Sequence, residues 1–578
     1  MTGAQVITRL LKEYKIKHIF GVPGDTSMAW HDALFEQREH IKHIACRDER
    51  SAAFMADTYA RISGRPGVVE VPSGGGATYV VGGVSEANES SIPLICLASD
   101  IAMHSDETDA LTELDQESLF SSVTKWRARV KLGSKLPHLV RKAFRMATFG
   151  RPGAVALSLP ENILSGQVDL KTEDIIGQSI YSEYPPHRPH PDRNLVLRVF
   201  ELLLKAKRPI VLAGGGVHAS KAWNELEALT QDLFLPVVTS INGKGSVRET
   251  APGAAGVVGA NGGRPTPNNL LSQADWVLVL GSRLNSVTTL GGTLFQQKPI
   301  VCQVDIDPEA LGNNIITSME IMSDIREFLR SFREIAVLSE TKGWTDWWHY
   351  AIDLANDGWE KDVEAQECYS DGEVLPASPR LVVKALQRNL PSNSILVADA
   401  GTPTPFISAF YRVPKSGRYI ISPRGHGGLG YALPASLGAK IAAPDNPVVG
   451  LFGDGSFAMS MGDLETIARE KLPIILIHFE NHCYGWIKKL QQLYYDQRYF
   501  AVDFKLVDYA TAARALGISV LEVSKALSLD VALQQALAMA EPVMINVPSR
   551  SPLEETPPVA KWLTDEKIPQ KHRLRLMY

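Results

Sequence analysis

The sequence has few cysteines, no long apolar run and no excess of charge of one sign. Its five cysteines lie far apart without CxxC spacing, which argues against a disulfide framework or a zinc site and fits a reducing compartment. Apolar runs such as PIILIHF stop after a few residues, so none is long enough for a membrane-spanning helix. The formal net charge is −5 with no long block of either sign, so we expect no nucleic-acid partner.

The N-terminal segment also lacks the features of an export signal. MTGAQVITRLLKEYKIKHIFGVPG is typical of an amphipathic helix followed by a strand, and it contains neither an uninterrupted apolar core nor a cleavage site. Together with the cysteine usage, this predicts a cytoplasmic protein that acts on a small molecule and binds no membrane.

What the sequence does have is length and a repeated alternation. Its 578 residues are too many for one hydrophobic core. Short apolar, β-branched runs alternate with longer helical patterns in three successive stretches, which is typical of parallel sheets covered by helices. We therefore predict an α/β protein with three successive parallel-sheet domains. Their expected bounds are residues 1–170, 190–335 and 370–555, followed by a tail at 556–578.

The strongest local pattern is a Gly-Asp-Gly-Ser turn from Gly453 to Ser456, at the end of an apolar strand. The next strand ends before Asn481, and this spacing fits one β-α-β crossover, which brings Asp454 and Asn481 to the same sheet edge. Carboxylate and amide oxygens suit Mg²⁺ carrying a diphosphate. Gly453 and Gly455 let the backbone approach the phosphates, and Ser456 opens a helix whose amides favour an anion. The alternative is a strand-to-helix turn in which these residues serve geometry alone.

GDGS followed by EN resembles the metal and diphosphate motif of thiamine-diphosphate-dependent enzymes, particularly the acetolactate synthase group. The resemblance implies that Asp454, Asn481 and the main-chain carbonyl of Cys483 hold Mg²⁺. It also implies that Tyr484 and Gly485 contact the cofactor. Family members more often have two adjacent asparagines, and the first is replaced here by glutamate; since the second is the metal ligand, we expect binding to persist.

A second part of the resemblance lies in the first stretch, where GVPGD precedes RDE and ARISGRPGV follows. In the family, a glutamate at the position of Glu49 hydrogen-bonds the pyrimidine ring of the cofactor. A carboxyl group there favours the tautomer in which the exocyclic amine acts as the base, so Glu49 is the expected catalytic residue. Such a carboxyl group should have a raised pKa. The alternative is that Asp48 and Glu49 only favour a helix N-terminus.

Other segments match the family's cofactor contacts. PSGGGAT resembles a glycine turn that packs against the cofactor, which implies contacts from Ser73 and Gly74. In GHGGLG, Gly427 matches the position whose carbonyl accepts the aminopyrimidine proton, and Leu429 matches the apolar residue wedged between the two rings. Thr402, in DAGTPTP, stands on the phosphate side.

The central stretch leaves its ligand open. Arg283 in GSRLN matches FAD-binding relatives, but Asn285, Ser286 and Val287 replace their Asp-Asp-Arg, and RLN is also similar to oxalyl-CoA and 2-hydroxyacyl-CoA lyases. The domain therefore binds FAD, another nucleotide or nothing.

The resemblance implies a carboligase that decarboxylates a 2-oxo acid and transfers the acyl-anion equivalent to a second carbonyl. The alternatives are a 2-oxo acid decarboxylase, an oxalyl-CoA or 2-hydroxyacyl-CoA lyase, and a catalytically silent regulatory relative. Family substrate positions differ here. Leu111-Thr112-Glu113 stands where the family has a Phe-Gln pair, and Leu490 stands where it has a tryptophan, so the donor and acceptor substrates stay open. Because the family's cofactor lies between chains, we expect a homodimer or homotetramer, while a monomer joining its own first and third domains remains the alternative.

Overall fold

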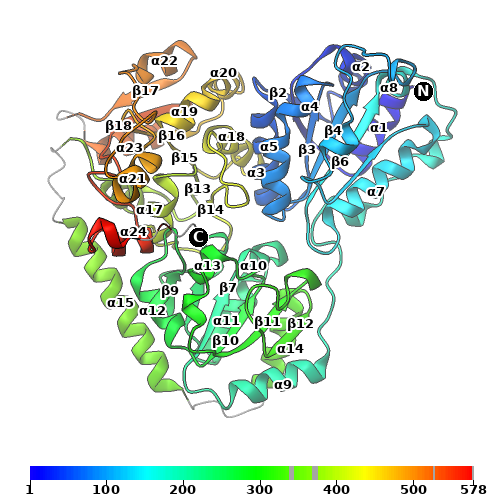
Figure 1. Cartoon of the computed structure of the whole chain (residues 1–578). Coiled ribbons are helices and arrows are strands. Elements are labelled where there is room, and N and C mark those ends of the chain that lie inside the picture. Colours follow the sequence, from blue (N-terminus) through cyan, green and yellow to red (C-terminus); the bar gives the residue numbers. More distant parts are fainter. Residues whose placement is uncertain (338–343, 368–374, 525–527, 574, 576–578) are drawn as a thin grey trace.

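The computed structural model describes residues 1–337, 344–367, 375–524, 528–573 and 575. Three six-stranded, all-parallel sheets follow one another along the chain, which confirms the predicted α/β class. The units that contain the first and third sheets lie side by side, and the central unit lies below them (Figure 1). No helix in this described part is long and apolar enough to cross a membrane.

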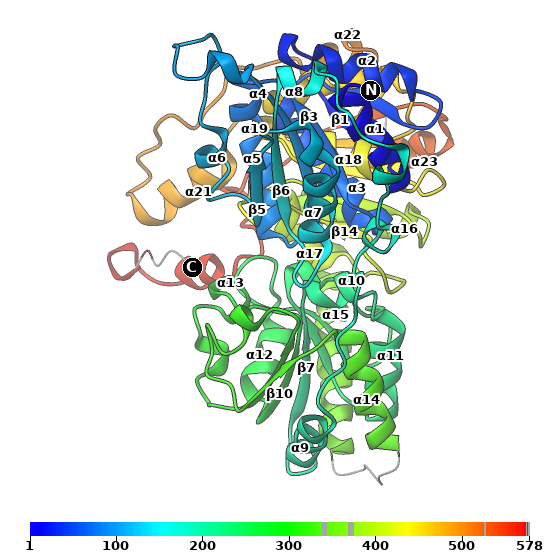
Figure 2. The same ribbon diagram turned by 90° about the vertical axis from the view of Figure 1, so that its right-hand side faces the viewer.

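The first unit has the strand order β2-β1-β3-β4-β6-β5. Three of its four inner strands, at 67–71, 94–100 and 154–160, are buried at every position, as expected for a sheet covered on both faces. In Figure 2 this unit lies in front of the third. Its strands are β1 (His18–Gly21), β2 (Lys42–Ala45), β3 (Gly67–Val71), β4 (Leu94–Asp100), β5 (Trp126–Arg129) and β6 (Ala154–Pro160). Its helices are α1 (Gly3–Glu13), α2 (Met28–Glu36), α3 (Glu49–Ser63), α4 (Gly75–Tyr79), α5 (Val81–Glu89), α6 (Gln116–Leu119), α7 (Leu136–Thr148) and α8 (Glu161–Ser165).

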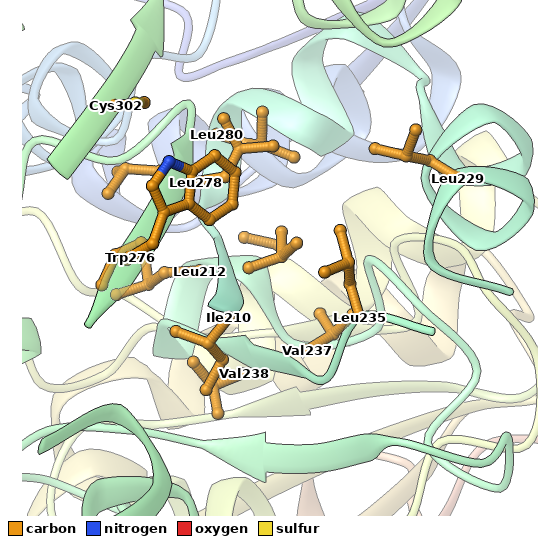
Figure 3. Close-up of a cluster of buried hydrophobic side chains, with 14 of the residues drawn as sticks. Ile210, Leu212, Leu229, Leu235, Val237, Val238, Trp276, Leu278, Leu280 and Cys302 are labelled. Carbon is orange, nitrogen blue, oxygen red and sulfur yellow. The ribbon is translucent and has the colours of Figure 1, made fainter. Parts of the chain in front are cut away.

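The central unit has the order β12-β11-β10-β7-β8-β9. Its core gathers around fully buried Trp276, Leu278 and Leu280 of β10, with side chains of β7 and β8 beside them (Figure 3). Its strands are β7 (Pro209–Ala213), β8 (Val237–Thr239), β9 (Ala254–Val257), β10 (Trp276–Leu280), β11 (Ile300–Asp305) and β12 (Met319–Met322). Its helices are α9 (Arg193–Leu203), α10 (Gly215–Ser220), α11 (Trp223–Asp232), α12 (Pro265–Gln273), α13 (Ser286–Thr289) and α14 (Ile325–Val337), and α15 (Thr345–Glu367) leads to the third unit.

The third unit repeats the pattern with the order β14-β13-β15-β16-β18-β17. Its strands are β13 (Ile395–Ala398), β14 (Ile420–Ile421), β15 (Val448–Gly453), β16 (Ile475–Glu480), β17 (Ser519–Glu522) and β18 (Val543–Pro548). Its helices are α16 (Pro379–Asn389), α17 (Pro403–Phe410), α18 (Ala432–Ala442), α19 (Asp454–Ser460), α20 (Leu464–Arg469), α21 (Gly485–Tyr494), α22 (Tyr509–Ala515), α23 (Leu529–Ala538) and α24 (Ala560–Asp565).

Helices α3 and α18 pack together and join the first unit to the third (Figure 1). A Cβ at Gly438 of α18 would lie 2.1 Å from the carbonyl oxygen of Met55, so the two backbones approach as closely as glycine allows. Beside this crossing, the Tyr431 hydroxyl donates to Asp57, which also pairs with Arg61 at 2.8 Å. All three side chains are buried, so a charged network completes an otherwise apolar interface.

Candidate active site

The predicted metal residues meet where β15 and β16 end. The strands pair in parallel with Gly453 opposite Phe479, so the residues after them share one edge of the sheet. Asp454 is the first residue of α19 and is almost fully buried. Its Oδ2 accepts hydrogen bonds from the backbone nitrogens of Asn481 and His482, both at 2.9 Å.

Three oxygens, one of them from this carboxylate, meet at the side chain of Asn481. Asn481 Oδ1 lies 3.2 Å from Asp454 Oδ2 and 3.3 Å from the carbonyl oxygen of Cys483. If the Asn481 amide were turned over, its nitrogen would donate hydrogen bonds to Asp454 Oδ2 and to the Cys483 carbonyl oxygen. A bound cation requires the present orientation, in which the amide oxygen faces these two oxygens. Octahedral Mg²⁺ with bonds of 2.0–2.1 Å places neighbouring ligands about 3 Å apart, close to these separations. These oxygens could therefore hold Mg²⁺.

The second oxygen of Asp454 supports the same interpretation. Oδ1 is buried and has no hydrogen-bond partner in the described part of the chain. The fully buried His478 Nε2 lies 3.3 Å from it. A buried carboxylate oxygen without a donor is costly unless a cation or water satisfies it.

The predicted cofactor-contact residues after each strand form tight turns. A Cβ at Gly455 would lie 2.5 Å from the Tyr484 ring, and one at Gly485 would lie 2.5 Å from Pro552. Ser456 is buried in the first turn of α19. Larger residues at these two glycines would displace the segments that carry Asp454 and Asn481.

Thr402 lies on the neighbouring strand end, before α17. Just ahead of it, the fully buried Asp399 accepts backbone hydrogen bonds from Ala400 and Ala432. Burial raises the pKa of the Asp399 carboxyl to about 7, although these hydrogen bonds oppose the shift. Asp399 therefore ties the end of β13 to the start of α18.

Gly427 and Leu429 lie in the loop before α18, and this loop is held from the first unit. Glu86 of α5 accepts hydrogen bonds from the backbone nitrogens of Gly425, His426 and Gly427, at 2.9, 2.7 and 3.3 Å. Gly427 has a φ of +69°, which favours glycine. A buried carboxylate thus fixes the loop whose carbonyl the resemblance places against the cofactor.

Glu49 is the first residue of α3 and is half-buried. Burial raises the pKa of its carboxyl group and the charges of Asp48 and Glu70 add to the rise, while a backbone hydrogen bond at the helix start opposes it. A Cβ at Gly76 would lie 3.2 Å from Glu49 Oε1, so the glycine turn borders the carboxylate. The expected rise in pKa is present.

Ser73 and Gly74 open that turn. The Ser73 hydroxyl is 2.8 Å from the Thr112 hydroxyl, and its backbone nitrogen donates to Thr26 Oγ1 at 3.1 Å. Gly74 has a φ of +58°, and a Cβ there would lie 2.7 Å from Thr112. Thr112 thus packs directly on the glycine turn.

The chain brings the predicted residues together in two groups. Asp454, Asn481 and Cys483 form one, and Glu49 with the glycine turn forms the other. The start of α3 contacts the far end of α19, since Arg50 donates to the carbonyl of Met459 at 2.7 Å. Among the described residues, no hydrogen bond or ion pair joins Glu49 to the oxygens around Asn481.

Sequence reasoning missed Glu86, Asp399 and His478. Each contacts a segment that is distant along the chain or that belongs to a neighbouring strand, so no local sequence motif identifies it. A polar residue within an apolar run, such as His478 in PIILIHF, was the one available signal.

A large cavity lies where the central unit meets the other two. It spans about 1520 Å³ of empty space, open solvent at its mouth included, and its lining includes Gly215, Arg283 and Asp305. Burial raises the pKa of Asp305, at the end of β11, to about 6. Arg283 donates to the carbonyl oxygen of Glu89 at 2.8 Å and so reaches the first unit.

Comparison with known proteins decides the family. The probable acetolactate synthase large subunit of Methanococcus aeolicus is 30% identical over 99% of this chain and 96% of its own length. The acetolactate synthase isozyme 3 large subunit of Escherichia coli is 31% identical over 93% of this chain and 92% of its own length. The acetolactate synthase of Mycobacterium bovis is 29% identical over all of this chain and 93% of its own length.

The chain belongs to the thiamine pyrophosphate enzymes. Residues 1–119 match the N-terminal thiamine pyrophosphate binding domain of that family, 196–332 its central domain and 399–547 its C-terminal thiamine pyrophosphate binding domain. The predicted family, an enzyme dependent on thiamine diphosphate (thiamine pyrophosphate) and similar to acetolactate synthase large subunits, is confirmed.

Proposed function

We propose that this thiamine pyrophosphate enzyme is a carboligase of the acetolactate synthase type, which decarboxylates a 2-oxo acid and joins the remaining acyl unit to a second carbonyl compound. The full-length similarity to acetolactate synthase large subunits supports a carboligase and does not favour a decarboxylase, a CoA lyase or a silent relative. The observation that carries the proposal is that the Asp454 carboxylate, the Asn481 side-chain amide and the Cys483 carbonyl meet at one sheet edge, where the buried Asp454 Oδ1 has no hydrogen-bond partner among the described residues. A cytoplasmic location remains part of this proposal.

The residues present fit a magnesium-bound diphosphate. Asp454, Asn481 and the Cys483 carbonyl would hold the metal, and the turns at Gly453 to Ser456 and at Tyr484 to Gly485 would border the phosphates. When bound, thiamine diphosphate supplies the carbon that stabilises an acyl-anion equivalent. The chain's own part is to hold that cofactor, keep its loop in place through Glu86, and present the Glu49 carboxyl group to the pyrimidine ring.

We further propose that the active site forms between two chains, in a homodimer or homotetramer. Within the described part of one chain, no hydrogen bond or ion pair joins Glu49 to the Asp454 group, and this supports the arrangement. Glu49→Gln and Asp454→Ala chains, each inactive alone, test it when they are mixed, unfolded and refolded together.

If sites form between chains, each mixed dimer keeps one intact site, because one chain supplies Glu49 and the other Asp454. Half of the dimers are mixed, so activity should recover to about a quarter of wild type. If sites form within single chains, the mixture stays inactive, and this outcome overturns the shared site.

The reaction is tested with pyruvate as a 2-oxo acid probe, with thiamine diphosphate and Mg²⁺ present. A carboligase yields a condensation product that gives acetoin after acid treatment. Free acetaldehyde without condensation product would favour a decarboxylase. Pyruvate turned over to neither product would exclude the acetolactate synthase reaction and direct the search to other 2-oxo acids.

For the central unit, we propose a nucleotide ligand in the cavity lined by Arg283 and Asp305. Its volume and its place at the carboxyl ends of parallel strands support this. A visible absorption spectrum and a native mass spectrum of the purified protein distinguish FAD, which is yellow, from a colourless nucleotide. A native mass equal to that of the chain without any ligand would count against both FAD and another nucleotide.

A further inference from the structure

Away from the oxygen cluster, the first unit contains a group of three side chains with metal-binding chemistry. His31 of α2, His43 of β2 and Glu70 of β3 each offer a ligand atom, and these atoms lie within 4.8 Å of one another. Both imidazoles face one carboxylate oxygen: His43 Nε2 is 2.9 Å and His31 Nε2 is 3.4 Å from Glu70 Oε1. The two rings lie edge to face, with centroids 5.0 Å apart.

The register of the sheet explains how the group forms. Strand β1 lies between β2 and β3, with His43 opposite Ile19 and Glu70 opposite Gly21. Residues 19 and 21 share a face, so His43 and Glu70 point to the same side, where α2 carries His31. A Cβ at Gly21 would lie 2.4 Å from Glu70 Oε1, so the carboxylate occupies the space that the missing side chain leaves.

Hydrogen bonding alone leaves this group incomplete. Glu70 is 1% exposed, and its Oε2 has no hydrogen-bond partner within the described ranges. His31 Nε2 likewise makes no hydrogen bond there, since its 3.4 Å approach to Oε1 is an ion-pair contact only. A buried carboxylate normally receives donors on both oxygens. Two imidazoles aimed at one oxygen, with the other oxygen bare, fit ligands that surround a cation.

The spacing suits a tetrahedral ion. With metal–ligand bonds of 2.0–2.2 Å, tetrahedral ligands lie about 3.4 Å apart. His31 and Glu70 are already at this separation, His43 would need to move from Glu70 by about half an ångström, and the ligand atoms of His31 and His43 lie within 4.8 Å of each other. Two histidines and one carboxylate leave the fourth position to water, and the histidine side chains, 21% and 17% exposed, give access from solvent.

We propose that His31, His43 and Glu70 form a binding site for a divalent transition-metal ion of the zinc class, separate from the magnesium and cofactor residues. Imidazole nitrogen favours such ions over Mg²⁺, which prefers oxygen ligands. The ion would tie α2, β2 and β3 together directly before the loops that carry Glu49 and Ser73. Its role is to stabilise the cofactor-facing edge of the first unit.

The test uses Co²⁺ as the probe with the full-length, tag-free protein after chelator treatment, and without thiamine diphosphate. The expected result is one equivalent of Co²⁺ per chain with the intense visible absorption of tetrahedral cobalt. His31→Gln and His43→Gln should each weaken binding by at least about tenfold and lose that absorption. Added Zn²⁺ should displace the cobalt and raise the melting temperature of wild type but not of these variants.

Two controls separate this site from others. His40→Gln changes an exposed histidine three residues before His43 and should bind Co²⁺ as wild type does. Asp454→Ala removes the oxygen cluster and should leave the tetrahedral spectrum intact, whatever happens to thiamine diphosphate binding. Wild type without tetrahedral cobalt, or His31→Gln and His43→Gln with unchanged cobalt affinity, overturns the proposal. Circular dichroism of each variant shows whether it has folded.

Discussion

Glu86 accepts a hydrogen bond from the backbone nitrogen of Gly427 at 3.3 Å, so a buried carboxylate of the first unit holds a cofactor loop of the third. The same carboxylate receives the two preceding backbone nitrogens, and every donor therefore points at a negative charge. Such charge-assisted hydrogen bonds are worth about 1.5–3 kcal/mol each.

Replacing Glu86 with Gln should loosen this loop. An amide turns its NH₂ group toward a backbone N–H in either orientation, so at least one of the three donors loses its acceptor. We expect the dissociation constant for thiamine diphosphate to rise at least about tenfold, measured by calorimetry with Mg²⁺ present. Glu117→Gln, at an exposed position of α6, is the control and should leave the affinity unchanged. A Glu86→Gln protein with wild-type affinity would show that the loop holds its position without the charge.

Replacing Glu49 with Gln should lower turnover by at least the ~10²-fold typical of a positioned acid–base group. The fold should remain intact, because the side chain is half-buried and Asp48, the N-cap of α3, is unchanged. Steady-state kinetics measure the loss, and Glu39→Gln, at an exposed position, is the matched control. Near-normal turnover would remove Glu49 from the mechanism.

Replacing Asp454 with Ala should abolish metal-dependent cofactor binding, since it removes the carboxylate that lies 3.2 Å from the Asn481 side chain. Calorimetry with and without Mg²⁺ measures the effect. Asp496→Ala, at an exposed position, should bind as wild type does. Unchanged affinity in Asp454→Ala would place the metal elsewhere.

The buried imidazole of His218 should make the free energy of unfolding depend on pH. Trp223 Nε1 donates to His218 Nδ1 at 2.9 Å, and His218 Nε2 lies 3.1 Å from the carbonyl of Lys244, so a second ring proton would face the Trp223 donor. Burial, with the nearby Arg418 charge, lowers the pKa of His218 to about 3.

The ring of His218 has a pKa near 6.5 in the unfolded chain. Its contribution to the free energy of unfolding is therefore complete above pH 6.5. It is lost at ~1.4 kcal/mol per unit as the pH falls toward the folded pKa. Between pH 7 and pH 5, wild type should therefore lose about 2 kcal/mol more than His218→Gln, measured by urea unfolding. An equal loss in both proteins would contradict the assignment, and His40→Gln should follow wild type.

The inner strands could be predicted from the sequence because a parallel strand covered on both faces needs a continuous apolar run. WVLVL and VVGLFG are such runs, GVVEV is interrupted only by Glu70, and each of the three is an inner strand. Edge strands were harder. Strand β14 has only two residues, and β5 carries two arginines within four residues, since an edge strand need not be apolar on both faces.

The oxygen cluster was predictable because one crossover along the chain brings Asp454 and Asn481 together. Partners that come from distant segments left no such spacing. Glu86 meets Gly427 only because α3 and α18 pack the first and third units together, and His43 meets Glu70 only across the intervening strand β1. Local patterns report neighbours along one strand-helix-strand unit and carry no information on packing between units.

The α3–α18 interface also determines what a break in the chain would do. The two helices pack so closely at Gly438 that no larger residue fits there, and the Asp57–Arg61–Tyr431 network lies beside the crossing. The proline-rich segment at 184–192 therefore connects two bodies that already bind each other through their own surfaces. A protease cut there should give two fragments that co-migrate as one native particle and separate only in denaturant, so the covalent connection is dispensable once the chain has folded.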